Sequence, residues 1–208
     1  MNLSEQLNCF MAETELDYAI CGGHAIDLFI GAKTRPHKDL DVVIFWEDRD
    51  KIIQYMLDND WAVYEPCGTP YLQKINNIAN QIRVKSNIWC IKPSNYHYKC
   101  TEHEKDMFAI NFDDSEQTDL GYIEFLFNTK TDGYFLYSRN YDVKRKLNEA
   151  VFHVDNIPCL APEMVHNKHR KSCVYDEILD IIKRQGMPIT RNYSMHFLAV
   201  FMSYYITK

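Results

Sequence analysis

The spacing of the apolar residues predicts an α/β or α+β core that is followed by a helical C-terminal region. Within the first 65 residues the pattern indicates a helix, a strand, a tight turn, a second helix and a second strand in succession. Strand-like segments recur between residues 87 and 137, and from Pro162 onward the apolar spacing becomes helical. A length of 208 residues fits one ordinary domain, or one compact domain with a small second one.

The elements of the N-terminal part follow from apolar spacing and from glycines. Apolar residues at helical spacing predict an amphipathic helix over residues 3–14. A short apolar run over residues 18–21 ends at Gly22 and Gly23, which predicts a buried strand entering a tight turn. Residues 25–30 then predict a buried helix, closed by a glycine.

The second strand is expected at the centre of the core. Residues 39–46 are rich in β-branched and aromatic side chains, and two carboxylates open the segment. A helix over residues 49–58 and a strand near residues 61–64 are predicted to follow.

Residues 66–120 are less regular. Strand-like segments stand at residues 87–92 and 107–112. The acidic run at residues 113–116 is interpreted as the turn of a hairpin that returns through residues 122–127.

The C-terminal part contains one more strand and then helices. A further antiparallel element is predicted at residues 134–137. A break near residues 156–158 divides the chain into a first domain, residues 1–156, and a helical C-terminal region, residues 157–208. The three helices predicted there cover residues 162–171, 175–184 and 192–205.

Composition excludes several classes of protein. The proportions of hydrophobic residues (46%) and charged residues (25%) are those of a globular protein and exclude wholesale disorder. No segment approaches the ~20 consecutive apolar residues of a membrane span, and the first residues lack the basic and apolar parts of a signal peptide. Seven scattered cysteines indicate reduced thiols. We therefore expect a cytoplasmic protein with no membrane partner.

The net charge of the chain indicates which class of binding partner to expect. The chain has 23 Lys and Arg against 29 Asp and Glu, which gives a net charge of −6. Proteins that coat nucleic acid normally carry a basic excess, so nucleic acid is not expected as a partner. A negative field raises the local concentration of cations, so the balance favours a cationic small molecule.

The chemistry is expected in the segment from Gly22 to Asp41. Two glycines at a strand-to-helix turn let backbone amides approach a ligand closely, and the positive end of the helix favours an anion. Asp39 and Asp41 are two residues apart on a predicted strand, so their side chains share a face. Paired carboxylates repel each other unless a cation lies between them, and their hard oxygen atoms suit Mg²⁺.

Each of these motifs has a plainer interpretation when it stands alone. A Gly-Gly pair is usually only a turn, and an Asp-x-Asp segment is usually a solvated strand entry. Their conjunction in this order favours a phosphate cradle beside a metal site, which is what nucleotide-dependent phosphoryl or nucleotidyl transfer requires.

The same residues resemble the signature of the aminoglycoside and lincosamide nucleotidyltransferases of the polymerase-β-like superfamily. The usual form of that signature is Gly-Gly-Trp-Ala-Ile-Asp, a Thr-Arg-x-His step and Asp-hydrophobic-Asp; here the segments are residues 22–27, 34–37 and 39–41, with His24 in place of the Trp. Further matches follow in the order of the family, at residues 88–93, 122–128, 138–140 and 157–163.

This resemblance implies an α+β fold with a polymerase-β-like nucleotidyltransferase core, in which a mixed β-sheet with flanking helices precedes a small helical C-terminal part. The nucleotidyltransferase domain would be residues 1–156. The resemblance also implies that Glu124 joins Asp39 and Asp41 as catalytic and metal-binding residues, with Glu124 acting as ligand, general base or both. The structural alternative is that Glu124 pairs with a Lys or Arg, or faces solvent on an edge strand.

The expected cofactors are Mg²⁺ and a nucleoside triphosphate, with ATP as the first choice. Gly22, Gly23 and the helix start that includes His24 are expected to hold the β- and γ-phosphates. Arg35 and His37 are expected either to contact phosphate or to brace the loop before the metal strand.

The predicted function is Mg²⁺-dependent transfer of a nucleoside monophosphate, AMP from ATP, to a hydroxyl of a small molecule. An aminoglycoside- or lincosamide-type antibiotic is the first acceptor to consider. Two alternatives remain: transfer to a macromolecule (RNA or protein, as in toxin–antitoxin pairs), and a non-catalytic nucleotide-binding module. The sequence does not predict the oligomeric state.

Overall fold

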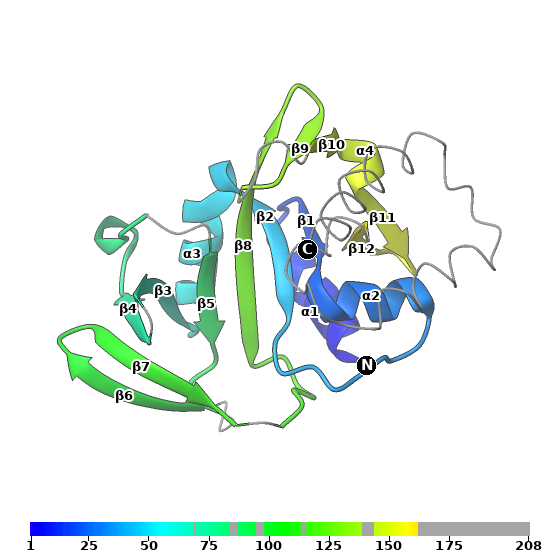
Figure 1. Cartoon of the computed structure of the whole chain (residues 1–208). Helices are drawn as coiled ribbons and strands as arrows, with labels where there is room; N and C mark the ends of the chain where they lie inside the picture. Colours follow the sequence, from blue (N-terminus) through cyan, green and yellow to red (C-terminus); the bar gives the residue numbers. More distant parts are fainter. Residues whose placement is uncertain (69, 84–86, 95–97, 114, 139–143, 162–208) are drawn as a thin grey trace, which may run out of the picture. The chain divides into compact units, whose positions relative to one another are not determined.

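The computed structural model describes residues 1–161, with gaps at residues 69, 84–86, 95–97, 114 and 139–143 (Figure 1). Its helices are α1 Leu3–Ala12, α2 Gly22–Ile30, the 3-10 turn η1 Trp46–Asp48, α3 Arg49–Asp58, the 3-10 turn η2 Ile78–Asn80 and α4 Leu147–Ala150. Its strands are β1 Tyr18–Ile20, β2 Asp41–Phe45, β3 Ala62–Gly68, β4 Tyr71–Ile75, β5 Asn87–Ile91, β6 Tyr98–Glu104, β7 Met107–Phe112, β8 Tyr122–Thr131, β9 Tyr134–Leu136, β10 Lys144–Lys146, β11 Val151–Val154 and β12 Ile157–Leu160.

The strands of the described residues form one mixed sheet. Its order is β11-β12-β1-β2-β8-β5-β3-β4-β7-β6, and β9 and β10 continue from β8 (Figure 1). The β2–β8 and β1–β12 pairs are parallel, whereas the other pairs are antiparallel. This confirms the predicted α+β class with a mixed sheet, and it places β2 and β8 next to each other at the centre.

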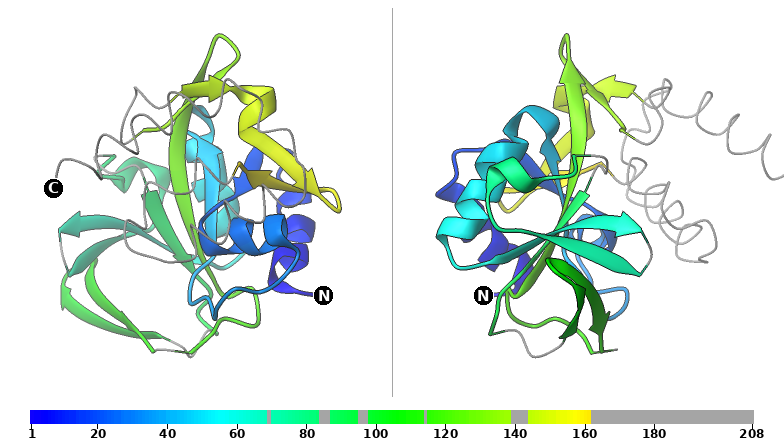
Figure 2. Two further views of the ribbon diagram at one scale, coloured as in Figure 1. Left: turned by 45° about the vertical axis from the view of Figure 1, so that its right-hand side comes forward. Right: turned by 90° about the vertical axis from the view of Figure 1, so that its left-hand side faces the viewer.

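Helices α1 and α3 lie side by side on one face of the sheet (Figure 2). A capping box between Asn2 and Glu5 begins α1, and the buried residues of the helix are Leu3, Leu7 and Met11 together with Ser4. The Phe10 ring of α1 lies 5.2 Å from the Tyr55 ring of α3. Both helices begin and end within two residues of the predicted bounds, because their apolar spacing is strong enough to define them locally.

The hairpin predicted from residues 113–116 is wrong. Strand β7 pairs with β4 and β6, whereas β8 pairs with β2, β5 and β9. The backbone N–H of Gln117 donates to the carbonyl of His37, and that of Leu120 donates to the side-chain oxygen of Gln6, each at 3.0 Å. The segment before β8 is therefore held by N-terminal residues far away in the sequence instead of closing a local turn.

The break predicted near residues 156–158 is the turn of the β11–β12 hairpin. Asp155 and Asn156 have φ values of 49° and 66°, the left-handed conformation typical of two-residue hairpin turns. Strand β12 then lies between β11 and β1 in the sheet. The division into domains at this point stays a prediction, because the three predicted C-terminal helices lie outside the described residues.

A buried ion pair, which the sequence analysis did not predict, lies at the start of α3. Arg49 and Glu65 are both 0% exposed, and Nη2 of Arg49 lies 2.8 Å from Oε1 of Glu65. Nε of Arg49 donates to Oε1 of Gln81 at 2.8 Å, and the N–H of Ile82 donates to Oε2 of Glu65 at 2.6 Å. Burial lowers the pKa of Arg49 from its usual value. The pair thus joins α3, β3 and the segment after η2.

Among the helices of the described residues, none is both long enough and apolar enough to cross a bilayer.

Candidate active site

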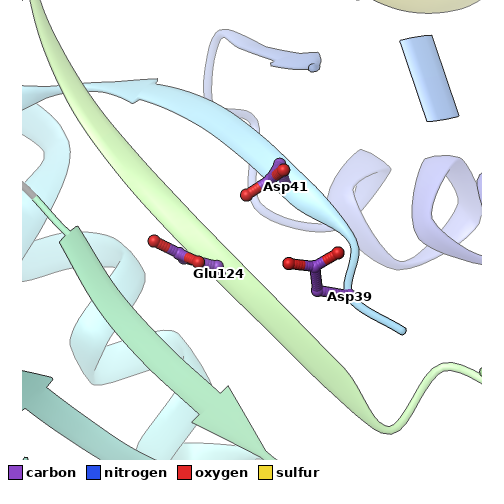
Figure 3. Close-up of side chains that lie close together, drawn as sticks. All are labelled: Asp39, Asp41 and Glu124. Carbon is purple, nitrogen blue, oxygen red and sulfur yellow. The ribbon is translucent and has the colours of Figure 1, made fainter. Parts of the chain in front are cut away.

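Two neighbouring parallel strands bring three carboxylates together (Figure 3). Asp41 is the first residue of β2, Glu124 is the third residue of β8, and the two are direct partners in the register. The strand predicted over residues 39–46 is shorter in the structure, so Asp39 precedes β2 by two residues and only Asp41 lies on the strand. One carboxylate oxygen from each residue lies within 4.8 Å of the others. The structure therefore assembles the three residues that the sequence analysis selected.

The chemistry of this cluster fits a divalent cation. Asp41 and Glu124 are only 5% and 7% exposed, and like charges this close together in a poorly solvated place repel each other. All the ligand atoms of the cluster are carboxylate oxygens, which are the donors that Mg²⁺ and Mn²⁺ prefer. A cation between them would turn the repulsion into attraction.

Gly22 lets the first turn of α2 pack against this cluster. The residue has a φ of +66°, and a Cβ atom built there would lie 2.2 Å from Oδ2 of Asp41. The N–H of the preceding Cys21 donates to the backbone carbonyl of Asp41 at 2.9 Å. Only glycine combines this backbone conformation with such a close approach. The positive end of α2 consequently begins beside the carboxylates.

Gly23 makes a second close approach, to His37. A Cβ atom on Gly23 would lie 2.2 Å from Cε1 of His37. His37 is 2% exposed, and its Nε2 lies 2.7 Å from Oδ2 of Asp27. The other oxygen of Asp27 accepts hydrogen bonds from the N–H of Thr34 at 2.9 Å and from its hydroxyl at 2.6 Å. These contacts brace the connection from α2 to β2; a contact of His37 with phosphate stays a prediction.

His24 and Arg35 also lie at the start of α2. The ring of His24 is 4.5 Å from that of His37, and its buried Nε2 has no hydrogen-bond partner among the described residues. Burial and the neighbouring His37 lower the pKa of His24 to about 4, so its imidazole is neutral at pH 7. The Arg35 guanidinium reaches to 3.2 Å from the position of a Cβ on Gly23. Roles for both in phosphate binding stay predictions.

The segment that contains the glycines and the two aspartates is similar to a known protein family. The family model described as aminoglycoside-2''-adenylyltransferase matches residues 5–65. The match includes Gly22, Gly23, Asp39 and Asp41. The resemblance to the aminoglycoside nucleotidyltransferases is confirmed over this segment. No curated protein matches the chain.

Three solved structures are similar to the chain at low identity. The crystal structure of the lincosamide antibiotic adenylyltransferase LnuA with lincomycin bound has 13% identity, covers 88% of this chain and 98% of its own, and gives a TM-score of 0.47. The solution structure of the antibiotic-resistance factor ANT(2'')-Ia has 14% identity, with coverage of 97% and 90% and a TM-score of 0.46. The crystal structure of ANT(2'')-Ia with adenylyl-2''-tobramycin has 13% identity, with coverage of 97% and 95% and a TM-score of 0.45. At this level of likeness, the roles of individual residues have to follow from the geometry of this chain.

The sequence analysis missed two residues of this site. Asp27 ends the first matched segment and braces His37, and its position in that segment was an available signal. Asn87 donates from Nδ2 to Oε1 of Glu124 at 2.9 Å. Asn87 gave no signal of its own, because its partnership depends on the pairing of β5 with β8.

Replacing Gly22 by Ala is expected to lower transfer activity by roughly 10–100-fold, because a displacement of about 1 Å at a reacting group has an effect of that order. The added methyl group has to push the Asp41 carboxylate away. The left-handed φ adds strain of about 1–3 kcal/mol. Steady-state kinetics and thermal melting of the purified variant measure both effects.

Gly31→Ala is the matched control for this change. Gly31 has a similar φ of +74°, but no described atom lies within 4 Å of its Cβ position. Its variant should lose similar stability and keep its activity within about twofold, since strain alone is added. Equal activity losses in the two variants would show that the contact between Gly22 and Asp41 is unimportant.

Proposed function

We propose that this chain is a nucleotidyltransferase that transfers a nucleoside monophosphate, AMP from ATP, to a hydroxyl of a small antibiotic-type molecule. One observation carries the proposal: the carboxylates of Asp39, Asp41 and Glu124 lie within 4.8 Å of one another. The segment that supplies the two aspartates matches the adenylyltransferase family model, and the first turn of α2 packs against Asp41.

The three carboxylates would hold Mg²⁺. The bound metal would neutralise the charge of the triphosphate and of the leaving pyrophosphate, a contribution worth several kcal/mol in such sites. Asp41 and Glu124 are placed by the backbone pairing of β2 with β8, and Asp39 by the connection that Asp27 and His37 brace. Their positions are therefore set before the substrate binds.

The start of α2 would bind the β- and γ-phosphates. The free N–H groups of its first turn and the positive end of the helix favour an anion, and the guanidinium of Arg35 lies beside Gly23. His24 is neutral at pH 7, so it would offer a hydrogen bond without adding charge. Together these groups would orient the pyrophosphate as the leaving group.

Glu124 would accept the proton of the acceptor hydroxyl. The hydroxyl oxygen then attacks the α-phosphorus in line, forming the new P–O bond while the bond to pyrophosphate breaks. Because pyrophosphate would leave toward α2 beside β2, the acceptor would approach from the opposite side, over β8 and β5. Trp89 of β5 is the direct register partner of Glu124 there.

The acceptor class rests on the family match and on charge. The family model is that of an adenylyltransferase of aminoglycosides, which are polycations. The net charge of −6 of the chain would concentrate such molecules near the site. We therefore place aminoglycosides ahead of lincosamides as acceptors.

The test is pyrophosphate release from each of the four nucleoside triphosphates with Mg²⁺, across a panel of aminoglycosides and lincosamides. Mass spectrometry then checks each acceptor for an added nucleotide. Acceptor-dependent release with ATP and an AMP adduct is the expected result. Triphosphate binding without transfer to any member of the panel would move the acceptor to another class, such as a macromolecule. Absence of triphosphate binding would contradict the function itself.

A further inference from the structure

We propose that Asn87 is a positioning residue for Glu124: its side-chain amide holds one carboxylate oxygen and thereby aims the carboxylate at the site formed with Asp39 and Asp41. This inference rests on the proposed function and deepens it, because it adds a residue outside the carboxylate cluster. It stands on a hydrogen bond of 2.9 Å between Nδ2 of Asn87 and Oε1 of Glu124.

Strand register explains why the two side chains meet. In the antiparallel pair of β5 and β8, Trp89 lies opposite Glu124, and Asn87 lies opposite Leu126. Asn87 is therefore the diagonal neighbour of Glu124 on the same face of the sheet, a position within reach of a longer side chain. The two aspartates approach Glu124 from the opposite side, because β2 borders β8 on the edge away from β5 (Figure 3).

The chemistry of an amide suits this task. A glutamate side chain has three rotatable bonds, and locking them costs conformational entropy that a fixed hydrogen bond offsets. An amide donates to the carboxylate without cancelling its charge, so the carboxylate keeps its attraction for a cation. A lysine at position 87 would compete with the metal, and an aspartate would add a further negative charge. Hydrogen-bonded partners of metal-binding side chains act in this way in other metal sites.

The test uses Asn87→Leu, which keeps the number and branching of the side-chain heavy atoms and removes the donor. Its matched control is Asn111→Leu, on an exposed position of β7. We expect Asn87→Leu to lower kcat by about 10–100-fold with the KM values changed less than about twofold. We also expect it to weaken the binding of Mn²⁺ alone, followed by electron paramagnetic resonance, by about tenfold or more. The control should match the wild type in both.

A double-variant comparison separates positioning from a merely structural role. In a Glu124→Ala background Asn87 has no carboxylate to orient, so adding Asn87→Leu should leave the residual Mn²⁺ affinity unchanged. The proposal is overturned if Asn87→Leu leaves Mn²⁺ affinity unaltered in the wild-type background, or if it weakens binding equally in both backgrounds.

These measurements also distinguish the failure of this inference from failure of the proposed function. If the wild type binds Mn²⁺ but transfers no nucleotide, the proposed reaction is contradicted, and the Mn²⁺ comparison still decides the role of Asn87. If the wild type binds no Mn²⁺, the metal site is contradicted, and the role of Asn87 falls with it.

Discussion

An Asp41→Asn variant is expected to lose transfer activity by at least roughly a thousandfold and to remain folded. Metal ions at such sites stabilise the transition state by several kcal/mol, and each loss of about 1.4 kcal/mol lowers the rate tenfold. Asp41 is in a central position of the cluster. It is the register partner of Glu124 on β8, and its side chain packs against Gly22 of α2. Its amide counterpart has the same shape and one charge less.

The stability of the same variant should change in the opposite direction. Without metal, Asp41→Asn is expected to melt at or above the temperature of the wild type, because it removes one of three mutually repelling carboxylates. Added Mg²⁺ should raise the melting temperature of the wild type more than that of the variant, since binding to the folded state stabilises it.

Asp132→Asn serves as the matched control. Asp132 is exposed in the turn between β8 and β9 and has a φ of 48°, a conformation that asparagine tolerates well. Its kinetics and melting should equal those of the wild type. Substantial transfer by Asp41→Asn, above about one tenth of the wild-type rate, would contradict the assignment of this carboxylate to the metal.

Glu65→Leu is expected to lower the free energy of unfolding by about 3–5 kcal/mol, the usual effect of breaking a buried ion pair from one side. Arg49 is 0% exposed, so its guanidinium would stay buried after losing the carboxylate of Glu65. The N–H of Ile82 would lose its acceptor as well. Urea denaturation followed by tryptophan fluorescence measures the change.

Two further variants show whether the charge is the cause. Glu149→Leu removes one partner of an exposed pair, Lys146–Glu149, in which the side chains are 61% and 43% exposed. That change should cost less than about 1 kcal/mol. The double variant Arg49→Met, Glu65→Leu should recover most of the lost stability, since replacing a buried pair by apolar residues is often nearly neutral. A single Glu65→Leu variant as stable as the wild type would show that water reaches Arg49.

The parts of the site that the sequence predicted are those that local chain geometry determines. Gly22 and Gly23 begin the strongly apolar helix α2, and Asp41 begins β2, so short-range rules were sufficient for these residues. Asp39 lies two residues before β2, so the alternation of side chains along a strand does not account for its place. Glu124 could be assigned only through the family resemblance, because no local rule says that β8 lies beside β2.

The errors share the same origin. Residues 113–116 have the composition of a turn, but Gln117 and Leu120 are hydrogen-bonded to His37 and Gln6 instead. Asn87 acts on Glu124 through the β5–β8 register, which apolar spacing does not reveal. Which strands pair with each other depends on how all of them pack in the sheet. Local patterns in one sequence do not show this pairing.

The position of β8 between β2 and β5 has a consequence for the folding of the protein during its synthesis. During synthesis at about 5–20 residues per second, β2 leaves the ribosome several seconds before β8. Until β8 inserts between strands that precede it in the chain, Glu124 is absent and the two aspartates have no complete metal site. Non-local pairing of this kind forms slowly. We therefore expect transfer activity of a nascent chain to appear only after the sheet has closed, and we expect a shortened product that ends before β8 to be inactive.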